Sequence, residues 1–313
     1  MIVAIVGPTG VGKTKLSVEL AKKYDAEIIS CDSMQIYRKM DIATAKVTKD
    51  EMQGAVHHMI DIKDAACDYS VYDYQRDARC ILDKLIKNNK NVIIVGGTGL
   101  YLKALLYDYN FNYTDKKKDY SEYSNEKLYD MVLKIDKDSK IHINNRQRLE
   151  SFLNNHFEGE EKHDAKKLYD AIIIGLTRPR DELYGSINER VDVMIKNGLI
   201  NEAKYFYDSK IYSKAIKTAI GYKELYEYFD GKISLEEATE LIKKKSRNYA
   251  KRQYTWFNNQ MDVKWFNIDA DNFDNTVCEV DKYIKKNFRV LLVLFSFYIN
   301  IAIVIVLAII KAF

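Results

Sequence analysis

The sequence predicts an α/β fold, a P-loop NTPase-like parallel sheet flanked by helices, with a small helical insertion domain. Amphipathic helical patterns alternate with short apolar runs at residues 2–6, 27–30, 92–95 and 171–176. This alternation is typical of a doubly wound parallel sheet. The first apolar run leads into GPTGVGKT, residues 7–14, and then into a helical pattern. A strand, a glycine-rich loop and a helix in that order form the context of a phosphate-binding P-loop.

The same patterns divide the chain into a core, an insertion and a tail. Periodicity is lost over the polar residues 110–125, and a helical pattern then runs over about residues 126–163. We predict a catalytic core with C-terminal helices at 1–112 and 168–287, including a late strand at 263–268, a helical insertion at 113–167 and a hydrophobic tail at 288–313.

Composition is that of an ordinary globular protein. Of 313 residues, 47% are hydrophobic and 30% are charged, and the net charge is +4. A core can be buried, but so mild a charge does not by itself identify a nucleic-acid partner. The four cysteines are scattered without a C-x-x-C pair. That spacing argues against a disulfide framework or structural zinc and favours the reducing cytoplasm.

Residues 7–14 complete the pattern G-x-x-x-x-G-K-[ST]. Glycines let backbone N–H groups converge on phosphate oxygens at the positive end of the following helix. Lys13 supplies a positive charge, and the Thr14 hydroxyl is suited to Mg²⁺. The predicted phosphate-binding residues are Gly7, Pro8, Thr9, Gly10, Val11, Gly12, Lys13 and Thr14. A glycine-rich turn without a ligand is the alternative, which both flanking elements disfavour.

Two polar residues follow later strands of the core. Asp32 lies in ISCDSMQIYRKMDIATAK, and Thr98 lies in VGGTGLY. Because the carboxyl ends of parallel strands line the ligand crevice of an open α/β sheet, both side chains are expected to face the P-loop. Taken alone, each also fits a turn or cap residue. The run NVIIVGGTG ends in glycines rather than in the Mg²⁺-binding aspartate of a P-loop NTPase.

A basic stretch, KKKSRNYAKR at residues 243–252, lies near the end of the core. It holds six cations, and no acidic residue occurs from 241 to 261. Arg247 and Lys251 are four residues apart and therefore share one helix face. A solvated helix face is the usual reading of a lysine run, but six cations without an acid favour contact with phosphates of a nucleic acid.

Seven segments together resemble the tRNA dimethylallyltransferase (isopentenyl-tRNA transferase) family in order and spacing. They are GPTGVGKT, DSMQIYRKMDIATAK, HHMIDI, GGTGLYLKALL, INERVDVMIKNGLINEAK, AIGYKELYEY and YAKRQYTWF. The resemblance covers most of residues 1–110 and 170–268. It implies a P-loop that binds a diphosphate leaving group. It also implies transfer of a dimethylallyl group from its diphosphate to N6 of the tRNA adenosine just 3′ of the anticodon, position 37.

The resemblance also implies roles for single residues. Asp32 would accept the proton of the attacking amine, Thr98 would bond the same adenine, and Mg²⁺ at Thr14 would stabilise the diphosphate. With the basic stretch, the predicted tRNA contacts are Asp32, Ser33, Met34, Gln35, Thr98, Arg148, Arg247, Lys251 and Arg252. The expected partners of this monomer are dimethylallyl diphosphate and a tRNA anticodon stem-loop whose adenosine is flipped out.

Departures from the family pattern fall in and around the insertion. The insertion is short, the family's HPN is HIN at 142–144, and Ser151 and Ser186 stand where basic residues are usual. These changes concern tRNA contacts rather than the transfer chemistry, so a divergent second copy with weaker activity or altered tRNA choice is one expectation. The alternatives are an adenylate isopentenyltransferase, a P-loop NTPase or kinase, and a tRNA-binding protein without activity.

The segment 290–310 is uncharged and long enough to cross a bilayer. Lys285, Lys286 and Arg289 precede it, and only Lys311 follows. The positive-inside rule then keeps the core in the cytoplasm. We predict a C-terminal membrane anchor, against two alternatives: a buried terminal helix and a non-native extension.

The anchor hypothesis is tested by comparing the full chain with one that ends at Asn287. Uncharged apolar residues hold a segment in the bilayer without help from surface charge, so the full chain should stay in membranes after an alkaline carbonate wash. The shortened chain should be soluble and equally active. Full-length protein that is soluble and monomeric without detergent would rule the anchor out.

Overall fold

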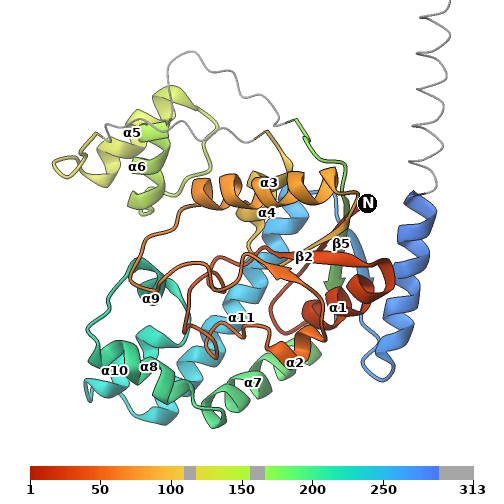
Figure 1. Cartoon of the computed structure of the whole chain (residues 1–313). Coiled ribbons are helices and arrows are strands. Elements are labelled where there is room, and N and C mark those ends of the chain that lie inside the picture. The colour runs from red at the N-terminus through yellow and green to blue at the C-terminus, as the bar shows by residue number, and fades with distance from the viewer. Residues whose placement is uncertain (109–117, 156–165, 289–313) are drawn as a thin grey trace, which may run out of the picture. The chain divides into compact units, whose positions relative to one another are not determined.

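The computed structural model describes residues 1–108, 118–155 and 166–288, and its central element is one parallel sheet (Figure 1). Its strands are β1 (Ile2–Val6), β2 (Ala26–Ser30), β3 (His57–His58), β4 (Asn91–Val95), β5 (Ile172–Thr177) and β6 (Lys264–Asn267). They pair in the order β3-β2-β4-β1-β5-β6, and every pair is parallel. The predicted α/β fold is confirmed.

The strand β3 is the one element of the sheet that the sequence did not predict. It has two residues, with Ile28 aligned with His57 and Ile29 with His58. The His58 ring pairs with the Glu27 carboxylate across this edge at 2.6 Å. So short a strand has no alternation to recognise, and its position depends on pairing with β2.

Helices connect and flank these strands. They are α1 (Lys13–Tyr24), α2 (Lys49–Met52), α3 (Val71–Lys87), α4 (Gly99–Leu106), α7 (Arg180–Lys196), α8 (Leu199–Asp208), α9 (Lys214–Thr218), α10 (Tyr222–Phe229) and α11 (Leu235–Gln260), with a further helical run at 273–288. The expected N-cap at Ser70 is confirmed. Its hydroxyl accepts the Asp73 N–H, and the Asp73 side chain accepts the Ser70 N–H, so two otherwise unpaired amides of the first turn are satisfied.

The two faces of the sheet are covered by different helices. One face packs with α1 through a buried set that includes Val3, Ile5, Ile28, Ile93, Leu16 and Leu20. Because side chains alternate along a strand, the residues between them face the opposite side. There α3 and α4 lie together (Figure 1) and stack Tyr74 on Tyr101 with ring centroids 4.1 Å apart. Each fully buried aliphatic side chain contributes about 1.5–3 kcal/mol to stability.

The described residues separate into two compact units, one within 1–106 and 169–288 and the other within 107–168. The smaller unit holds α5 (Asn125–Ile135) and α6 (Arg146–Asn155). Its own core contains Tyr120, Leu128, Val132 and Leu149. The expected single helical stretch over 126–163 is wrong, since residues 136–145 are not helical. That segment, DKDSKIHINN, carries aspartate, serine and asparagine, which bond to nearby backbone and favour turns over helix.

Close packing of α11 against the turn after β4 requires glycines in that turn. A Cβ on Gly97 would lie 1.9 Å from Nε2 of Gln253, and one on Gly99 would lie 2.0 Å from the Trp256 ring. Both distances are far below van der Waals contact. The GGTG sequence therefore lets a helix more than 150 residues away press directly onto this turn.

Within the described residues, no helix is long and apolar enough to cross a membrane. The predicted anchor at 290–310 lies outside those residues.

The packing of α11 on this turn predicts contrasting effects of two glycine substitutions. Gly99→Ala should lower the free energy of unfolding by about 1–3 kcal/mol, because the new methyl group overpacks the site against Trp256. In Gly185→Ala, in α7, the new methyl group has no atom within 4 Å. This substitution should raise the free energy of unfolding by about 0.5–1 kcal/mol, because alanine has the higher helix propensity. Urea unfolding of both variants measures the difference. Equal destabilisation by the two would contradict the packing argument.

Candidate active site

Three loops meet at the carboxyl edge of the sheet. The P-loop follows β1, Asp32 follows β2, and Thr98 follows β4; these strands are neighbours in the order β2-β4-β1. The Cys31 N–H bonds to the Val95 carbonyl at 2.7 Å, and the Gly96 N–H bonds to the Ile5 carbonyl at 3.2 Å. The structure therefore brings the predicted phosphate site and the predicted base-binding residues to one edge, as expected for an open α/β sheet.

The P-loop backbone takes conformations that only glycine adopts readily. Gly7, Gly10 and Gly12 have φ angles of 137°, 79° and 95°, in the region where a Cβ is strained. Helix α1 begins directly after Gly12, so its first N–H groups lie at the end of the loop and form an anion-binding end. The Lys13 ammonium donates to the Pro8 carbonyl at 2.8 Å, which folds its side chain back over the loop.

The pKa of Lys13 is lowered to about 7. Burial is the main cause, the nearby Arg190 guanidinium adds to the lowering, and the Asp32 carboxylate partly opposes both. A lysine in this state is close to half-protonated at neutral pH. An arriving anion would favour its ammonium form and so draw a proton onto the side chain.

Arg190 of α7 is a site residue that the sequence did not indicate. Its guanidinium donates to the Thr9 hydroxyl at 3.3 Å. Burial lowers its pKa, and Asp32 opposes that shift, but an arginine stays charged in a protein. One arginine in an amphipathic helix gives no sequence signal; only the fold places it beside the P-loop.

Asp32 and Thr98 shape the turn between the strand ends. The Asp32 carboxylate accepts the Met34 N–H at 2.9 Å. The Thr98 hydroxyl accepts the Ser33 N–H at 3.1 Å and donates to the Ser33 hydroxyl at 3.3 Å. Asp32 and Thr98, which are predicted to bind one adenine, lie on two segments that are thus joined at Ser33. The same bonds show that both residues also act structurally as turn residues.

Helix α11 presents polar side chains to this turn. The Gln253 side chain accepts the Thr9 N–H at 2.9 Å and donates to the Gly97 carbonyl at 3.0 Å. Burial, followed by the Asp32 charge, raises the pKa of Tyr249, which lies close enough to Thr98 to bond with it. Gln253 lies on the buried stripe with Ala250 and Phe257. A polar residue on an apolar stripe is a signal that the sequence interpretation did not use.

Some cations of the basic stretch of α11 bond to neighbouring helices, and others are exposed. Lys243 pairs with Asp192 at 2.8 Å, and Lys245 pairs with the buried Glu224 at 2.5 Å. The Arg247 guanidinium donates to Asn188 at 2.5 Å. The exposed members are Lys244, Lys251 and Arg252. The acidic partners lie elsewhere in the sequence, so part of the stretch joins α11 to α7 and α10.

Arg148 lies exposed on α6 of the smaller unit. Ser33, Met34 and Gln35 are all partly exposed in the turn after Asp32. The Gln35 side chain donates to the carbonyls of Thr44 and Ala45 at 3.4 and 3.3 Å. These residues remain predicted tRNA contacts.

The residues around the P-loop suit a metal carried mainly by its substrate. Among the described residues, no group of three histidine, cysteine, aspartate or glutamate side chains could hold an ion. Thr14 is exposed at the start of α1. Mg²⁺ commonly keeps several waters and binds one or two protein groups together with substrate phosphates, and one hydroxyl beside a phosphate-binding loop fits that mode.

A family model described as IPP transferase matches residues 35–260. The tRNA dimethylallyltransferase of Geobacillus thermodenitrificans (strain NG80-2) is 46% identical over 306 residues, which cover 92% of this chain and 97% of that protein. The chain belongs to the IPP transferase family. A second relative, the tRNA dimethylallyltransferase of Bacillus cytotoxicus, is 47% identical over 284 residues, 85% of this chain and 90% of that protein.

Solved structures of the IPP transferase family agree with this assignment. The full-length tRNA isopentenylpyrophosphate transferase from Bacillus halodurans matches with a TM-score of 0.73 at 44% identity, over 91% of this chain and 95% of that one. A eukaryotic dimethylallyltransferase, captured acting on tRNA, matches with a TM-score of 0.79 at 25% identity, over 92% of this chain and 79% of that one.

The lowered pKa of Lys13 predicts how affinity for dimethylallyl diphosphate depends on pH. The free site loses its ammonium as pH rises through about 7, whereas phosphate groups are largely ionised above about pH 6. Affinity should therefore fall as pH rises from 6.5 to 8.5, with proton uptake on binding. Calorimetry in buffers of different ionisation enthalpy measures both.

The matched control for this experiment is Lys13→Arg, because arginine keeps its charge over the whole range. Its affinity should be flat between pH 6.5 and 8.5. Parallel pH curves for the wild-type protein and Lys13→Arg would show that the ligand or another group, rather than Lys13, titrates.

Proposed function

We propose that this chain transfers a dimethylallyl group from dimethylallyl diphosphate to N6 of adenosine 37 of a tRNA, giving N6-isopentenyladenosine and diphosphate. The observation that carries the proposal is the shared position of the P-loop, Asp32 and Thr98 at one edge of the sheet. Proton acceptor and phosphate site are then close enough for a transfer between two substrates. The names of the relatives support the same activity.

The P-loop side of the site would stabilise the leaving group. As the allylic C–O bond breaks, negative charge grows on the diphosphate oxygens. The loop amides, the Lys13 ammonium and the Arg190 guanidinium lie together there, and preorganised donors of this kind lower the barrier where charge develops. Arg190 extends the predicted diphosphate site beyond residues 7–14.

Mg²⁺ is part of this proposal. Thr14 would hold the ion beside the diphosphate, where it would supply charge neutralisation at the leaving oxygens. The chain's own part is to present that hydroxyl at the start of α1.

The opposite side of the site would handle the amine. The N6 lone pair of adenine is delocalised into the ring, so the amine is a weak nucleophile. As the C–N bond forms, the amine becomes acidic and Asp32 accepts its proton. Thr98 orients the base, and Tyr249 stays protonated beside them, since its pKa is raised. The Tyr249 hydroxyl can therefore donate a hydrogen bond to the same base.

The tRNA must reach this site with its adenosine unstacked, because the amine of a stacked base cannot contact a recessed diphosphate. The exposed Lys251 and Arg252 lie within one turn of Tyr249 on α11 and would bind phosphates of the anticodon stem-loop. A tRNA substrate suits action in the cytoplasm, and we propose that the monomer is active.

A competition assay tests the proposed acceptor. Purified protein receives labelled dimethylallyl diphosphate together with unmodified tRNA and AMP at equal concentration. The label should enter tRNA alone, and Asp32→Asn should lose at least about 30-fold in kcat while tRNA still binds, because proton transfer by a positioned base contributes about 10²–10⁴-fold. Label in AMP would identify an adenylate isopentenyltransferase instead. ATP hydrolysis without any prenyl transfer would favour an NTPase.

A further inference from the structure

Two loop stretches, residues 33–46 before α2 and residues 59–63 after it, take an unusual path. Outside regular secondary structure, Lys39, Ala45, Met59 and Asp61 have φ angles of 64°, 47°, 64° and 55°. Left-handed backbone at residues other than glycine costs about 1–2 kcal/mol each and persists only where surrounding contacts enforce it. Residues 33–46 and 59–63 therefore need contacts from elsewhere to hold this shape.

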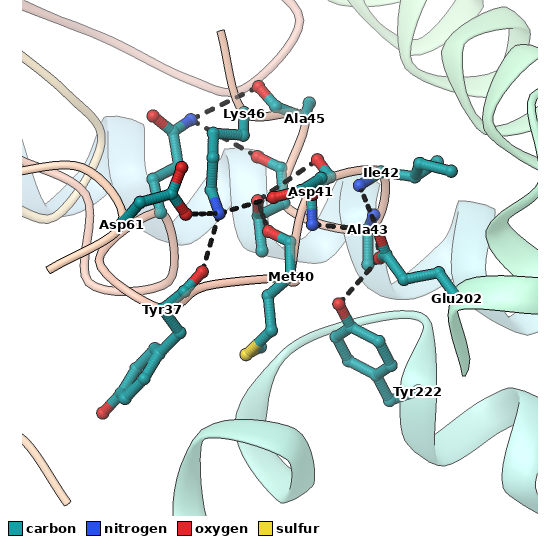
Figure 2. Close-up of polar contacts among 12 residues, drawn as sticks. Tyr37, Met40, Asp41, Ile42, Ala43, Ala45, Lys46, Asp61, Glu202 and Tyr222 are labelled. Atoms are coloured by element: carbon teal, nitrogen blue, oxygen red, sulfur yellow. Dashed lines mark hydrogen bonds and ion pairs between the residues drawn. The ribbon is translucent and has the colours of Figure 1, made fainter. Parts of the chain in front are cut away.

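One such contact comes from α8. The Glu202 carboxylate accepts three consecutive backbone N–H groups, those of Asp41, Ile42 and Ala43, at 2.9, 2.7 and 3.0 Å (Figure 2). These amides lie at the start of the turn 41–46 and have no partner within that turn. The turn itself is closed by two bonds, from the Ala45 N–H to the Ile42 carbonyl and from the Lys46 N–H to the Asp41 carbonyl. An anion at such an amide cluster acts as a helix cap does.

Glu202 is itself held in place. The Tyr222 hydroxyl donates to it at 2.8 Å, and Tyr222 is fully buried against the edge of Phe206. Burial and the Glu202 charge raise the pKa of Tyr222, so this hydroxyl remains a donor. One turn along α8, Tyr205 accepts a hydrogen bond from Lys39 at 2.8 Å. Two residues on one face of α8 thus reach the same segment.

The second contact comes from within the two stretches. The Lys46 ammonium, whose side chain is 5% exposed, donates to the Tyr37 carbonyl and to the Asp41 and Asp61 carboxylates at 2.6, 2.6 and 2.5 Å (Figure 2). Its partners belong to both stretches, Tyr37 and Asp41 to residues 33–46 and Asp61 to residues 59–63. A buried lysine needs such partners, because an unpaired buried charge is strongly unfavourable.

Both contacts converge on Gln35. The Asp61 N–H donates to the Gln35 carbonyl at 3.2 Å, and the Gln35 side chain donates to the carbonyls of Thr44 and Ala45. Gln35 is therefore bonded to the turn 41–46, which Glu202 caps, and to Asp61, which Lys46 binds. It lies three residues beyond Asp32, on the strip that also carries Ser33 and Met34.

We propose that Glu202 and Lys46 are positioning residues, which hold residues 33–45 in the form that receives the tRNA anticodon loop. The proposal rests on the proposed function. It assigns a structural role to two residues that are not predicted to contact either substrate. The side-chain hydrogen bonds of Glu202 and Lys46 go to residues 37, 41–43, 61 and 222, and not to the P-loop or to Gln253. Loss of either residue should therefore weaken use of tRNA while leaving the diphosphate site intact.

The test compares Glu202→Ala and Glu202→Gln with the wild-type protein. Removing a charged acceptor from three amides should lower kcat/KM for tRNA by about tenfold or more, because bonds to charged groups are the stronger ones. Glu202→Gln keeps one acceptor oxygen and should fall between. The Kd for dimethylallyl diphosphate, measured by calorimetry, should stay within about twofold, and this split separates positioning from a general loss of folded protein.

Glu237→Ala is the matched control, since Glu237 also accepts a backbone N–H, that of Ser234, at the start of α11. It should leave kcat/KM for tRNA unchanged. Hydrogen exchange gives a readout independent of activity: amides of residues 33–46 should lose protection in Glu202→Ala and in Lys46→Met, and not in Glu237→Ala. Unaltered exchange in both loop variants would overturn the proposal.

The two levels of proposal fail in different ways. Wild-type protein that does not prenylate tRNA would contradict the proposed function. Wild-type transfer with an unaltered kcat/KM for tRNA in Glu202→Ala would overturn the positioning role alone. Equal losses in tRNA use and in diphosphate binding would also overturn it, because they would assign Glu202 to stability.

Discussion

The buried side-chain amide of Gln253 is the contact on which the arrangement of the site depends. It accepts the N–H of Thr9 in the P-loop and donates to the carbonyl of Gly97 in the turn after β4. Parallel pairing brings the ends of β1 and β4 to one edge but leaves the loops beyond them unconstrained. A buried backbone group must find a partner, and Gln253 supplies one to each loop. Gln253 thereby ties the P-loop to the turn that carries Thr98.

Different helices hold the two parts of the proposed site. Helix α11 holds the P-loop and the turn after β4, which are proposed to contact the reacting groups. Helices α8 and α10 hold the segment that follows Asp32, through Glu202 and Tyr222. Charged groups also meet at the P-loop. The Asp32 carboxylate lies near both Lys13 and Arg190, and Glu51 also lies near enough to Arg190 to interact with its charge. An arriving anion would favour the ammonium form of Lys13, which gives the Lys13 proton a role in the proposed binding.

The fold and half of the site could be predicted from local pattern. Apolar runs identify five of the six strands, all except β3, and the glycine-rich loop identifies residues 7–14. Strand topology then places Asp32 and Thr98 together. Arg190, Gln253 and Glu202 could not be found in this way, because each acts through a partner more than 150 residues distant. The break between α5 and α6 was not predicted, because the polar residues 136–145 are few and helical patterns lie on both sides of them. The predicted roles of Arg148, Arg247, Lys251 and Arg252 toward tRNA stay predictions.

The most direct test of this account is single-turnover prenyl transfer by Gln253→Leu with both substrates saturating. Leucine removes both bonds at similar volume, and Gln260→Leu, which changes an exposed glutamine of the same helix, is the control. The account predicts that both substrates still bind Gln253→Leu within a few-fold, while transfer slows about 100-fold, as small misplacements of reacting groups do. Transfer at the wild-type rate in a folded Gln253→Leu protein would contradict it.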